Sequence, residues 1–120
     1  KITYPWKLTL GDYAWVGDDA VLYTLGEITI GANSVVSQKC YLCTGSHDFM
    51  SPHFDITASP VVIGEKCWLA TDVFVAPGVS VGDGTVVGAR SSVFKSLPAN
   101  KICRGNPAVV IRERVETEKL

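Results

Sequence analysis

Two histidines, His47 and His53, are the only ones in this chain of 120 residues. The ordinary pKa of imidazole, near 6.5, lets a histidine exchange protons around neutral pH, so a well-placed histidine can act in acid–base chemistry. His47 ends the segment Cys43-Thr44-Gly45-Ser46-His47-Asp48 and leads into a long stretch that contains His53. A surface histidine without a role is the alternative interpretation. We favour a functional His47, because it lies where a regular scaffold meets a loop.

The four cysteines do not form a metal-binding pattern. Cys40 and Cys43 make one C-x-x-C, but no second pair completes a zinc site. Cys40 and Cys67 occupy repeat positions that require a small inward side chain, which predicts buried packing residues. A catalytic zinc held by three histidines would need one more histidine than the chain contains. We therefore expect neither a metal nor a disulfide.

An aliphatic residue returns every six residues along most of the chain, and a usually small residue follows it four places later. The period fits neither an amphipathic helix nor simple strand alternation, and it favours a coiled parallel β structure. Three hexads close one triangular turn of about 18 residues, so the sequence predicts an all-β, left-handed parallel β-helix shaped as a triangular prism. The predicted turns are residues 10–27, 30–47, 63–80 and 81–98. The aliphatic positions are Leu10, Val16, Leu22, Ile30, Val36, Leu42, Ile63, Leu69, Val75, Val81, Val87 and Val93.

The interruptions of the repeat define the expected domain organisation. Residues 1–105 are predicted to form the β-helix, with an inserted loop at 48–62. Residues 106–120 begin with Asn-Pro and continue with mixed charge, which predicts a short C-terminal helix that covers the open end of the prism. The chain begins with Lys rather than Met, and the repeat starts within a few residues, so we expect upstream sequence to be missing.

Side chains that point outward should stack into one column on each face of the prism. Two of the three predicted columns are apolar, where a solitary solenoid would be polar. A triangular prism can bury two faces in a three-fold ring, so we expect a homotrimer. The predicted columns are Trp15, Val35, Trp68 and Val86; Val21, Tyr41, Phe74 and Ser92; and Glu27, His47, Ser80 and Pro98.

Composition excludes several classes of partner. With 47% hydrophobic and 19% charged residues, the chain is typical of a folded globular protein. Eleven basic and twelve acidic residues give a net charge of −1, so we expect no nucleic-acid partner and no membrane partner. No stretch approaches the roughly 20 apolar residues of a membrane span, and no signal peptide is evident. We expect a cytoplasmic protein.

Several segments together resemble the hexapeptide-repeat (left-handed parallel β-helix) acyltransferases, and the resemblance covers nearly the whole chain. The opening Tyr4-Pro5-Trp6-Lys7-Leu8 and the segment Leu42 to Asp48 are similar in particular to the colanic acid biosynthesis acetyltransferase branch. The remaining segments are Cys67-Trp68-Leu69-Ala70, Ala76-Pro77-Gly78-Val79, Val87-Gly88-Ala89-Arg90-Ser91 and Gly105-Asn106-Pro107-Ala108.

The resemblance implies an acetyl-CoA-dependent O-acetyltransferase that works as a trimer, with acetyl-CoA in the groove between neighbouring subunits and His47 as general base. It implies that Trp68 flanks the reacting end and that Thr71 and the Ala89 backbone line the pantetheine arm. Lys95 and Arg112 would reach the phosphates of coenzyme A. An ordinary solvated lysine is the alternative for Lys95.

Two positions depart from the family pattern. Val109 stands where the family often has a basic residue, and Arg104 stands where a small residue is usual, which affects the nucleotide end of the site. The group that orients His47 is also open: Glu27 and Asp48 are the candidates.

The acceptor is not specified by any motif, and family analogy favours a hydroxyl of a sugar or polysaccharide precursor. A non-catalytic β-helix scaffold or interaction subunit remains the alternative function, because it would have the same fold.

Overall fold

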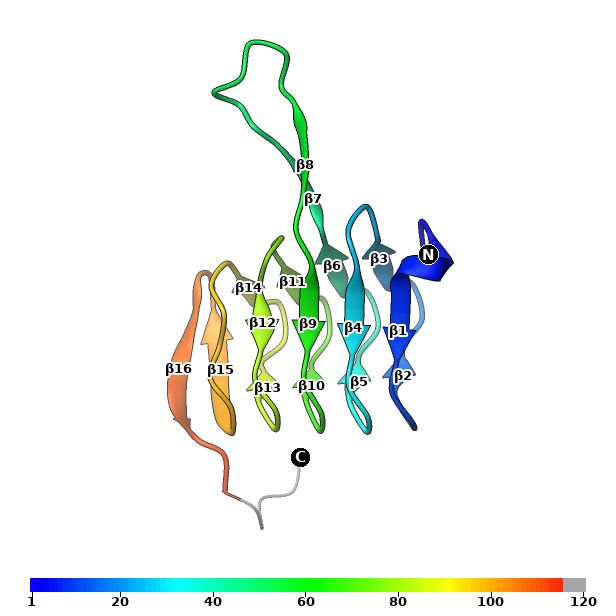
Figure 1. Ribbon diagram of the computed structural model, residues 1–120. Coiled ribbons are helices and arrows are strands. Elements are labelled where there is room, and N and C mark those ends of the chain that lie inside the picture. Colours follow the sequence, from blue (N-terminus) through cyan, green and yellow to red (C-terminus); the bar gives the residue numbers. More distant parts are fainter. Residues whose placement is uncertain (116–120) are drawn as a thin grey trace.

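Short parallel strands stack into the three faces of a triangular prism (Figure 1), and the computed structural model describes residues 1–115. The first face contains β1 (Leu8–Leu10), β4 (Ile28–Ile30), β9 (Val61–Ile63) and β12 (Ser80–Val81). The second contains β2 (Trp15–Val16), β5 (Val35–Val36), β10 (Trp68–Leu69), β13 (Val86–Val87), β15 (Lys101–Gly105) and β16 (Ala108–Glu113). The third contains β3 (Val21–Tyr23), β6 (Tyr41–Cys43), β11 (Phe74–Val75) and β14 (Ser92–Val93).

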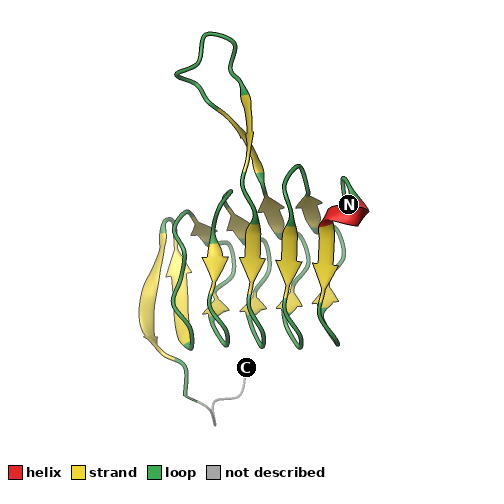
Figure 2. Ribbon diagram, viewed as in Figure 1, coloured by secondary structure: helices red, strands yellow, loops and turns green. Residues whose placement is uncertain are grey.

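Two further elements complete the described chain. A two-stranded hairpin, β7 (Gly45–His47) and β8 (Ile56–Ala58), leaves the prism between the third and first faces (Figure 1). The helical content of residues 1–115 is one 3-10 turn, η1 (Pro5–Lys7), next to the first strand (Figure 2). No helix within residues 1–115 has the length and hydropathy needed to cross a membrane.

The six-residue period produces the observed register. Ile30 pairs with Leu10 on one side and with Ile63 on the other, so equivalent hexad positions lie directly above one another. Parallel pairing of successive turns confirms the predicted β-helix fold class. Both apolar columns are also confirmed: Trp15, Val35, Trp68 and Val86 are aligned on the second face, and Val21, Tyr41, Phe74 and Ser92 on the third.

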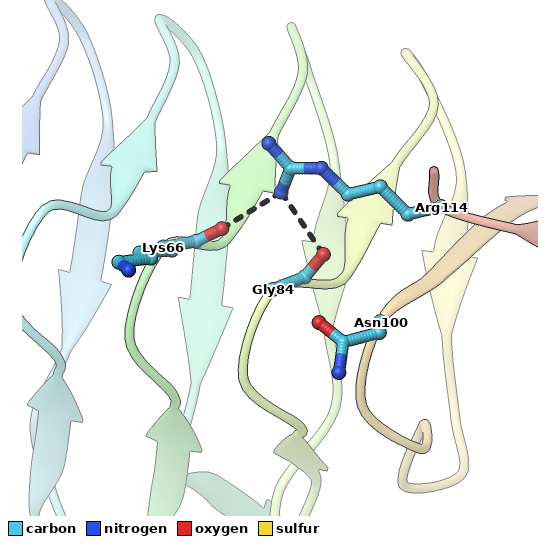
Figure 3. Close-up of a pocket in the computed structure, with 4 residues that line it drawn as sticks. All are labelled: Lys66, Gly84, Asn100 and Arg114. Carbon is cyan, nitrogen blue, oxygen red and sulfur yellow. Dashed lines mark hydrogen bonds between the residues drawn. The ribbon is translucent and has the colours of Figure 1, made fainter. Parts of the chain in front are cut away.

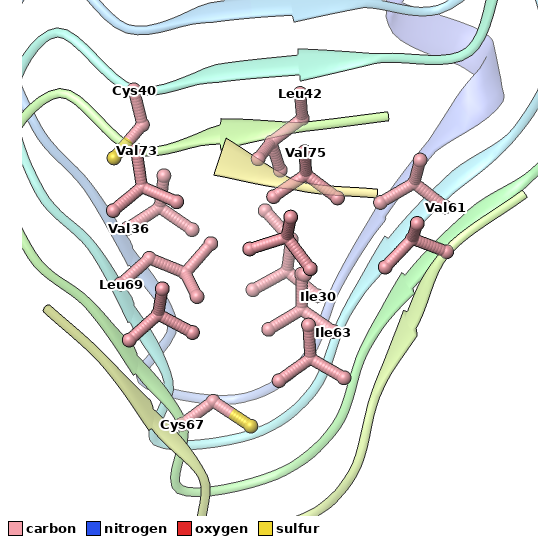
Figure 4. Close-up of a cluster of buried hydrophobic side chains, with 14 of the residues drawn as sticks. Ile30, Val36, Cys40, Leu42, Val61, Ile63, Cys67, Leu69, Val73 and Val75 are labelled. Carbon is pink, nitrogen blue, oxygen red and sulfur yellow. The ribbon is translucent and has the colours of Figure 1, made fainter. Parts of the chain in front are cut away.

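Aliphatic side chains from all three faces fill the interior of the prism (Figure 4). Cys40 and Cys67 are buried among them, which confirms their interpretation as packing residues. Burial raises the pKa of both thiols above the ordinary value of 9.0, so they stay protonated and unreactive near neutral pH. All four cysteines are free.

Small polar residues at the corners bond the backbone of adjacent turns. Ser34 Oγ donates to the Gly64 carbonyl at 2.6 Å, and Thr85 Oγ1 donates to the Pro98 carbonyl at 2.5 Å. Each hydroxyl is buried, and its bond offsets the cost of burying a polar group at a corner. A small hydroxyl residue four places after the aliphatic one therefore joins consecutive turns.

The third predicted column is wrong. The outward residue of β4 is Thr29, because Ile28 and Ile30 are both buried, and Thr29 pairs with Val62. Residues 28 and 29 therefore form part of the strand, and Glu27 precedes it. His47 pairs with Ile56 in the hairpin and so lies outside the column altogether.

The predicted C-terminal helix is also wrong for the described part of residues 106–120. Residues 108–113 form β16, which pairs antiparallel with β15 and extends the second face. The β-branched residues Val109, Val110 and Ile111 favour a strand, and the edge of β15 offers unpaired backbone groups to it. Residues 116–120 lie outside the described residues.

The inserted segment contains regular secondary structure, where the sequence predicted a loop. Residues 48–62 include β8 and the start of β9, and the connection between the hairpin strands is residues 48–55. The hairpin projects away from the prism (Figure 1).

We expect Leu69→Ala to lower the free energy of unfolding by about 2–5 kcal/mol, because Leu69 is 0% exposed and its loss leaves a cavity. Denaturant unfolding followed by circular dichroism measures the change. Leu10→Ala is the matched control, since Leu10 is 48% exposed at the end of the stack and should lose much less. Equal losses for the two variants would contradict the packing described here.

Candidate functional site

His47 is exposed at the outer end of the hairpin ladder, next to the connection formed by residues 48–55, and a backbone group orients its ring. Its Nδ1 lies 2.9 Å from the carbonyl oxygen of Phe54, across the hairpin. A carbonyl oxygen can only accept a hydrogen bond, so Nδ1 carries the proton in this contact. The neutral ring then has its lone pair on Nε2, which is the arrangement a proton acceptor requires.

The hairpin connection is stabilised by its own polar groups. Asp48 Oδ1 accepts from the Met50 amide at 3.0 Å, and Ser51 Oγ donates to Asp55 Oδ2 at 2.9 Å. The Asp48 amide also donates to the Asp55 carbonyl at 2.8 Å. These bonds fix the chain around Phe54, whose carbonyl orients the His47 ring.

The group that contacts His47 Nδ1 is thus a backbone carbonyl. Neither candidate from the sequence, Glu27 or Asp48, supplies it: the Asp48 carboxylate caps the turn, and Glu27 lies before β4. A backbone acceptor carries no residue-type signal, so the sequence could not have identified Phe54.

Trp68, Thr71 and Ala89 lie together along the corner between the second and third faces. Trp68 is half-buried on the outward side of β10, and its Nε1 donates to Ser37 Oγ at 3.0 Å, toward this corner. Thr71 follows β10, and its carbonyl accepts from the Arg90 amide, next to Ala89, at 2.8 Å. Adjacent turns therefore bring Trp68, Thr71 and Ala89 to the same corner of the prism.

Arg112 shares the outward side of the second face with Trp68. It pairs with Ile102, which aligns with Val86, which in turn aligns with Trp68. Residues directly opposite each other in a sheet point to the same side, so these four residues form a row. Three strand spacings of about 4.8 Å separate Trp68 from Arg112 by about 14 Å.

The predicted site residues therefore fall into two groups. Trp68, Thr71, Ala89 and Arg112 belong to the second face and its corner with the third. Lys95 is exposed and follows β14 at the corner between the third and first faces, where the hairpin with His47 also leaves. Within one chain, the two groups occupy different corners of the prism.

Two hollows lie at the remaining corner, between the first and second faces. One, of about 410 Å³, is lined by Lys66, Gly84, Asn100 and Arg114 (Figure 3). In it, Arg114 Nη1 donates to the carbonyls of Lys66 and Gly84, at 2.9 Å each. The other, of about 420 Å³, extends to Trp68. The Arg114 contacts could not be predicted from the sequence, because backbone carbonyls accept these hydrogen bonds.

A family sequence model described as "Bacterial transferase hexapeptide (six repeats)" matches residues 60–95. The chain is 86% identical over 118 residues to WcaF of Escherichia coli (strain K12), which carries the provisional name colanic acid biosynthesis acetyltransferase. That match covers 98% of this chain and 65% of WcaF. The chain is also 32% identical to WbbJ of the same organism, provisionally named a lipopolysaccharide biosynthesis O-acetyl transferase, covering 91% of this chain and 62% of WbbJ.

Solved structures show the same architecture. A maltose O-acetyltransferase from Clostridium difficile 630 matches with a TM-score of 0.92 and 28% identity, over 97% of this chain and 64% of that one. The hexapeptide-repeat acetyltransferase VCA0836 from Vibrio cholerae, complexed with acetyl-CoA, matches with a TM-score of 0.90 and 24% identity, over 96% and 64%, which shows the fold.

The chain matches the hexapeptide transferase family model over residues 60–95 and is similar to WcaF over 98% of its length, in agreement with the resemblance seen in its sequence. It spans about 65% of the length of the WcaF relatives it matches.

We expect the neutral His47 ring to carry its proton on Nδ1. Long-range ¹H–¹⁵N correlation spectra at a pH above 7 distinguish the two tautomers, and His53→Gln assigns the signals because the chain has only two histidines. A neutral His47 protonated mainly on Nε2 would contradict the contact with Phe54.

Proposed function

We propose that the protein is an acetyl-CoA-dependent O-acetyltransferase that acts on a hydroxyl of a sugar or polysaccharide precursor, with His47 as general base. The observation that carries the proposal is the His47 ring, whose Nδ1 contact with the Phe54 carbonyl leaves Nε2 as proton acceptor. The 86% identity to WcaF and the names of the relatives support the acetyl donor and the class of acceptor.

In the proposed reaction, His47 Nε2 takes the proton of the acceptor hydroxyl while its oxygen attacks the thioester carbonyl carbon. The carbonyl oxygen becomes a tetrahedral oxyanion that a backbone N–H stabilises. Collapse of this intermediate breaks the carbon–sulfur bond, and the imidazolium returns its proton to the departing thiolate. The products are the acetyl ester and coenzyme A, and His47 is neutral again.

We assign donor binding to the residues suggested by the family resemblance. Trp68 flanks the thioester, and Thr71 and the Ala89 backbone line the pantetheine arm along their shared corner. Arg112 and Lys95 bind the phosphates as cations. The row from Trp68 to Arg112 supports this assignment, because it gives an extended donor a continuous surface.

We propose that the site is completed between two copies of a homotrimer. The hairpin with His47 lies at a different corner from Trp68, Thr71 and Ala89, whose corner we call the donor edge. One copy therefore supplies the base, and its neighbour supplies the donor edge. The exposed apolar side chains on both faces support this assembly: Trp15 is 65% exposed, and Tyr41, Phe74 and Phe94 form a row with ring centroids 5.9 and 6.0 Å apart. We place the reaction in the cytoplasm, where acetyl-CoA is available.

We expect His47→Ala to lower turnover by about 10² to 10⁴ while the fold is retained, because general-base catalysis contributes a factor of that size. The assay is thiol release from acetyl-CoA across a panel of sugar acceptors. His53→Ala is the matched control and should keep near-normal turnover. A wild-type protein that shows no saturable acetyl-CoA binding would instead support the scaffold function.

We expect Phe94→Asp to dissociate the trimer, because it places a charge in the apolar row of the third face. Sedimentation analysis should give three times the mass of one chain for the wild type and a smaller species for the variant. Tyr13→Asp is the control, since Tyr13 is exposed but lies outside both apolar columns. A monomeric wild type would refute the shared site.

A further inference from the structure

The two C-terminal strands of the second face pair with one irregularity. Arg104 is opposite Val109 and Cys103 is opposite Val110, but the next pair is Ile102 with Arg112. Ile111 is therefore an extra residue on β16 with no counterpart on β15. This is a β-bulge, which changes the side to which the following residues point.

The bulge decides the side on which Arg112 lies. Cys103 is fully buried and Ala108 packs against the core, so the register places Val110, which is 45% exposed at the end of the stack, on the same side of the sheet as Cys103. Without an extra residue, alternation would place Arg112 on that side too. With the bulge, Arg112 is opposite Ile102 and points outward, in the row with Trp68.

Charge favours the bulged register over the regular one. In the bulged register Lys101 is opposite Glu113, and the two side chains form an ion pair. In a regular register Lys101 would be opposite Arg112, and two like charges in that position destabilise a strand pair. The charges of Lys101, Arg112 and Glu113 therefore stabilise the bulged register relative to the regular one.

Arg114 directly follows Glu113 and holds the end of β16 against the prism by hydrogen bonds. Its backbone N–H donates to the Asn100 carbonyl at 2.9 Å. Its guanidinium Nη1 donates to the carbonyls of Lys66 and Gly84, which belong to two successive turns of the prism (Figure 3). The end of an edge strand is thereby tied to three places in the scaffold.

We propose that the Ile111 bulge, the Lys101–Glu113 ion pair and the Arg114 guanidinium form a register lock that holds Arg112 outward, toward the phosphates of the acyl donor. This inference rests on the proposed function. Arg114 is a positioning residue within it, because its guanidinium bonds to backbone carbonyls and acts on the donor only through Arg112.

The lock should affect only donors that carry phosphates. Loss of the Arg114 side chain removes two charge-assisted hydrogen bonds and lets the strand end leave its register. Arg112 then spends less time on the outward side, and the contact with the nucleotide end weakens. The pantetheine arm binds along a different corner and keeps its contacts.

The test compares acetyl-CoA with S-acetylpantetheine, a donor that lacks the nucleotide. We expect Arg114→Ala to raise KM for acetyl-CoA about tenfold, consistent with the loss of a hydrogen bond to a charged group. Its kcat and its KM for S-acetylpantetheine should change less than twofold. Lys66→Ala is the matched control and should resemble the wild type, because it removes an exposed cation at the same corner and leaves the Lys66 carbonyl in place for Arg114.

A double-mutant cycle tests whether Arg114 acts through Arg112. The Arg112→Ala, Arg114→Ala double variant should have the same KM for acetyl-CoA as Arg112→Ala alone. Fully additive effects, or an equal loss for both donors, would overturn the lock. A Lys101→Glu, Glu113→Lys exchange should restore the KM that Glu113→Lys alone raises.

A structural measurement separates failure of the lock from failure of the proposed function. Amide hydrogen exchange of residues 108–113 should be faster in Arg114→Ala than in Lys66→Ala, whether or not the protein transfers acetyl groups. Unchanged exchange would refute the lock. Absence of acetyl-CoA binding with faster exchange would refute the proposed function alone.

Discussion

The structure depends on the pairing of each turn of the prism with the turns above and below it. Ile30 pairs with Leu10 of one neighbouring turn and with Ile63 of the other, and the side chains of Ile30 and Ile63 are buried in the interior. A shift of one residue would turn every inward side chain outward, so the buried aliphatic row fixes the register strongly. This rigid register also fixes the outward residues, including Trp68, and the corners from which a hairpin can leave.

The sequence was sufficient to predict the structure where the repeat is regular, and it was insufficient where the repeat is interrupted or ends. The hexads predicted the columns of Trp68 and Phe74 because period and burial coincide there. They misplaced Glu27, because a two-residue insertion belongs to the strand and pairs with its neighbours. They also suggested a helix after Asn106, because Pro and mixed charge resemble a helix start, whereas the open edge of β15 stabilises a strand.

The candidate site was predictable only in part, for a related reason. The residue types of His47 and Trp68 indicate chemistry, and the repeat indicates their faces. The His47 ring is oriented by the backbone carbonyl of Phe54, and a contact of this kind follows from local chain geometry rather than from a residue type. The register of β16, which decides the side of Arg112, depends on one bulged residue in the same way.

The rigid prism holds the two groups of predicted site residues at different corners. In the proposed function, a regular scaffold presents the donor edge and an excursion from another corner presents the base, so neither half is sufficient alone. This division makes assembly part of the proposed function, because stacking of copies around a three-fold axis would bring the two corners together.

The most direct measurement mixes two inactive variants. One copy carries His47→Ala, and the other carries Ala89→Arg, which would obstruct the pantetheine groove at an exposed corner. Trimers reassembled from an equal mixture should recover about a quarter of wild-type turnover, because each seam draws its base and its donor edge at random from two equal pools. Turnover no higher than that of the separate variants would show that base and donor edge come from the same copy, and it would contradict this account.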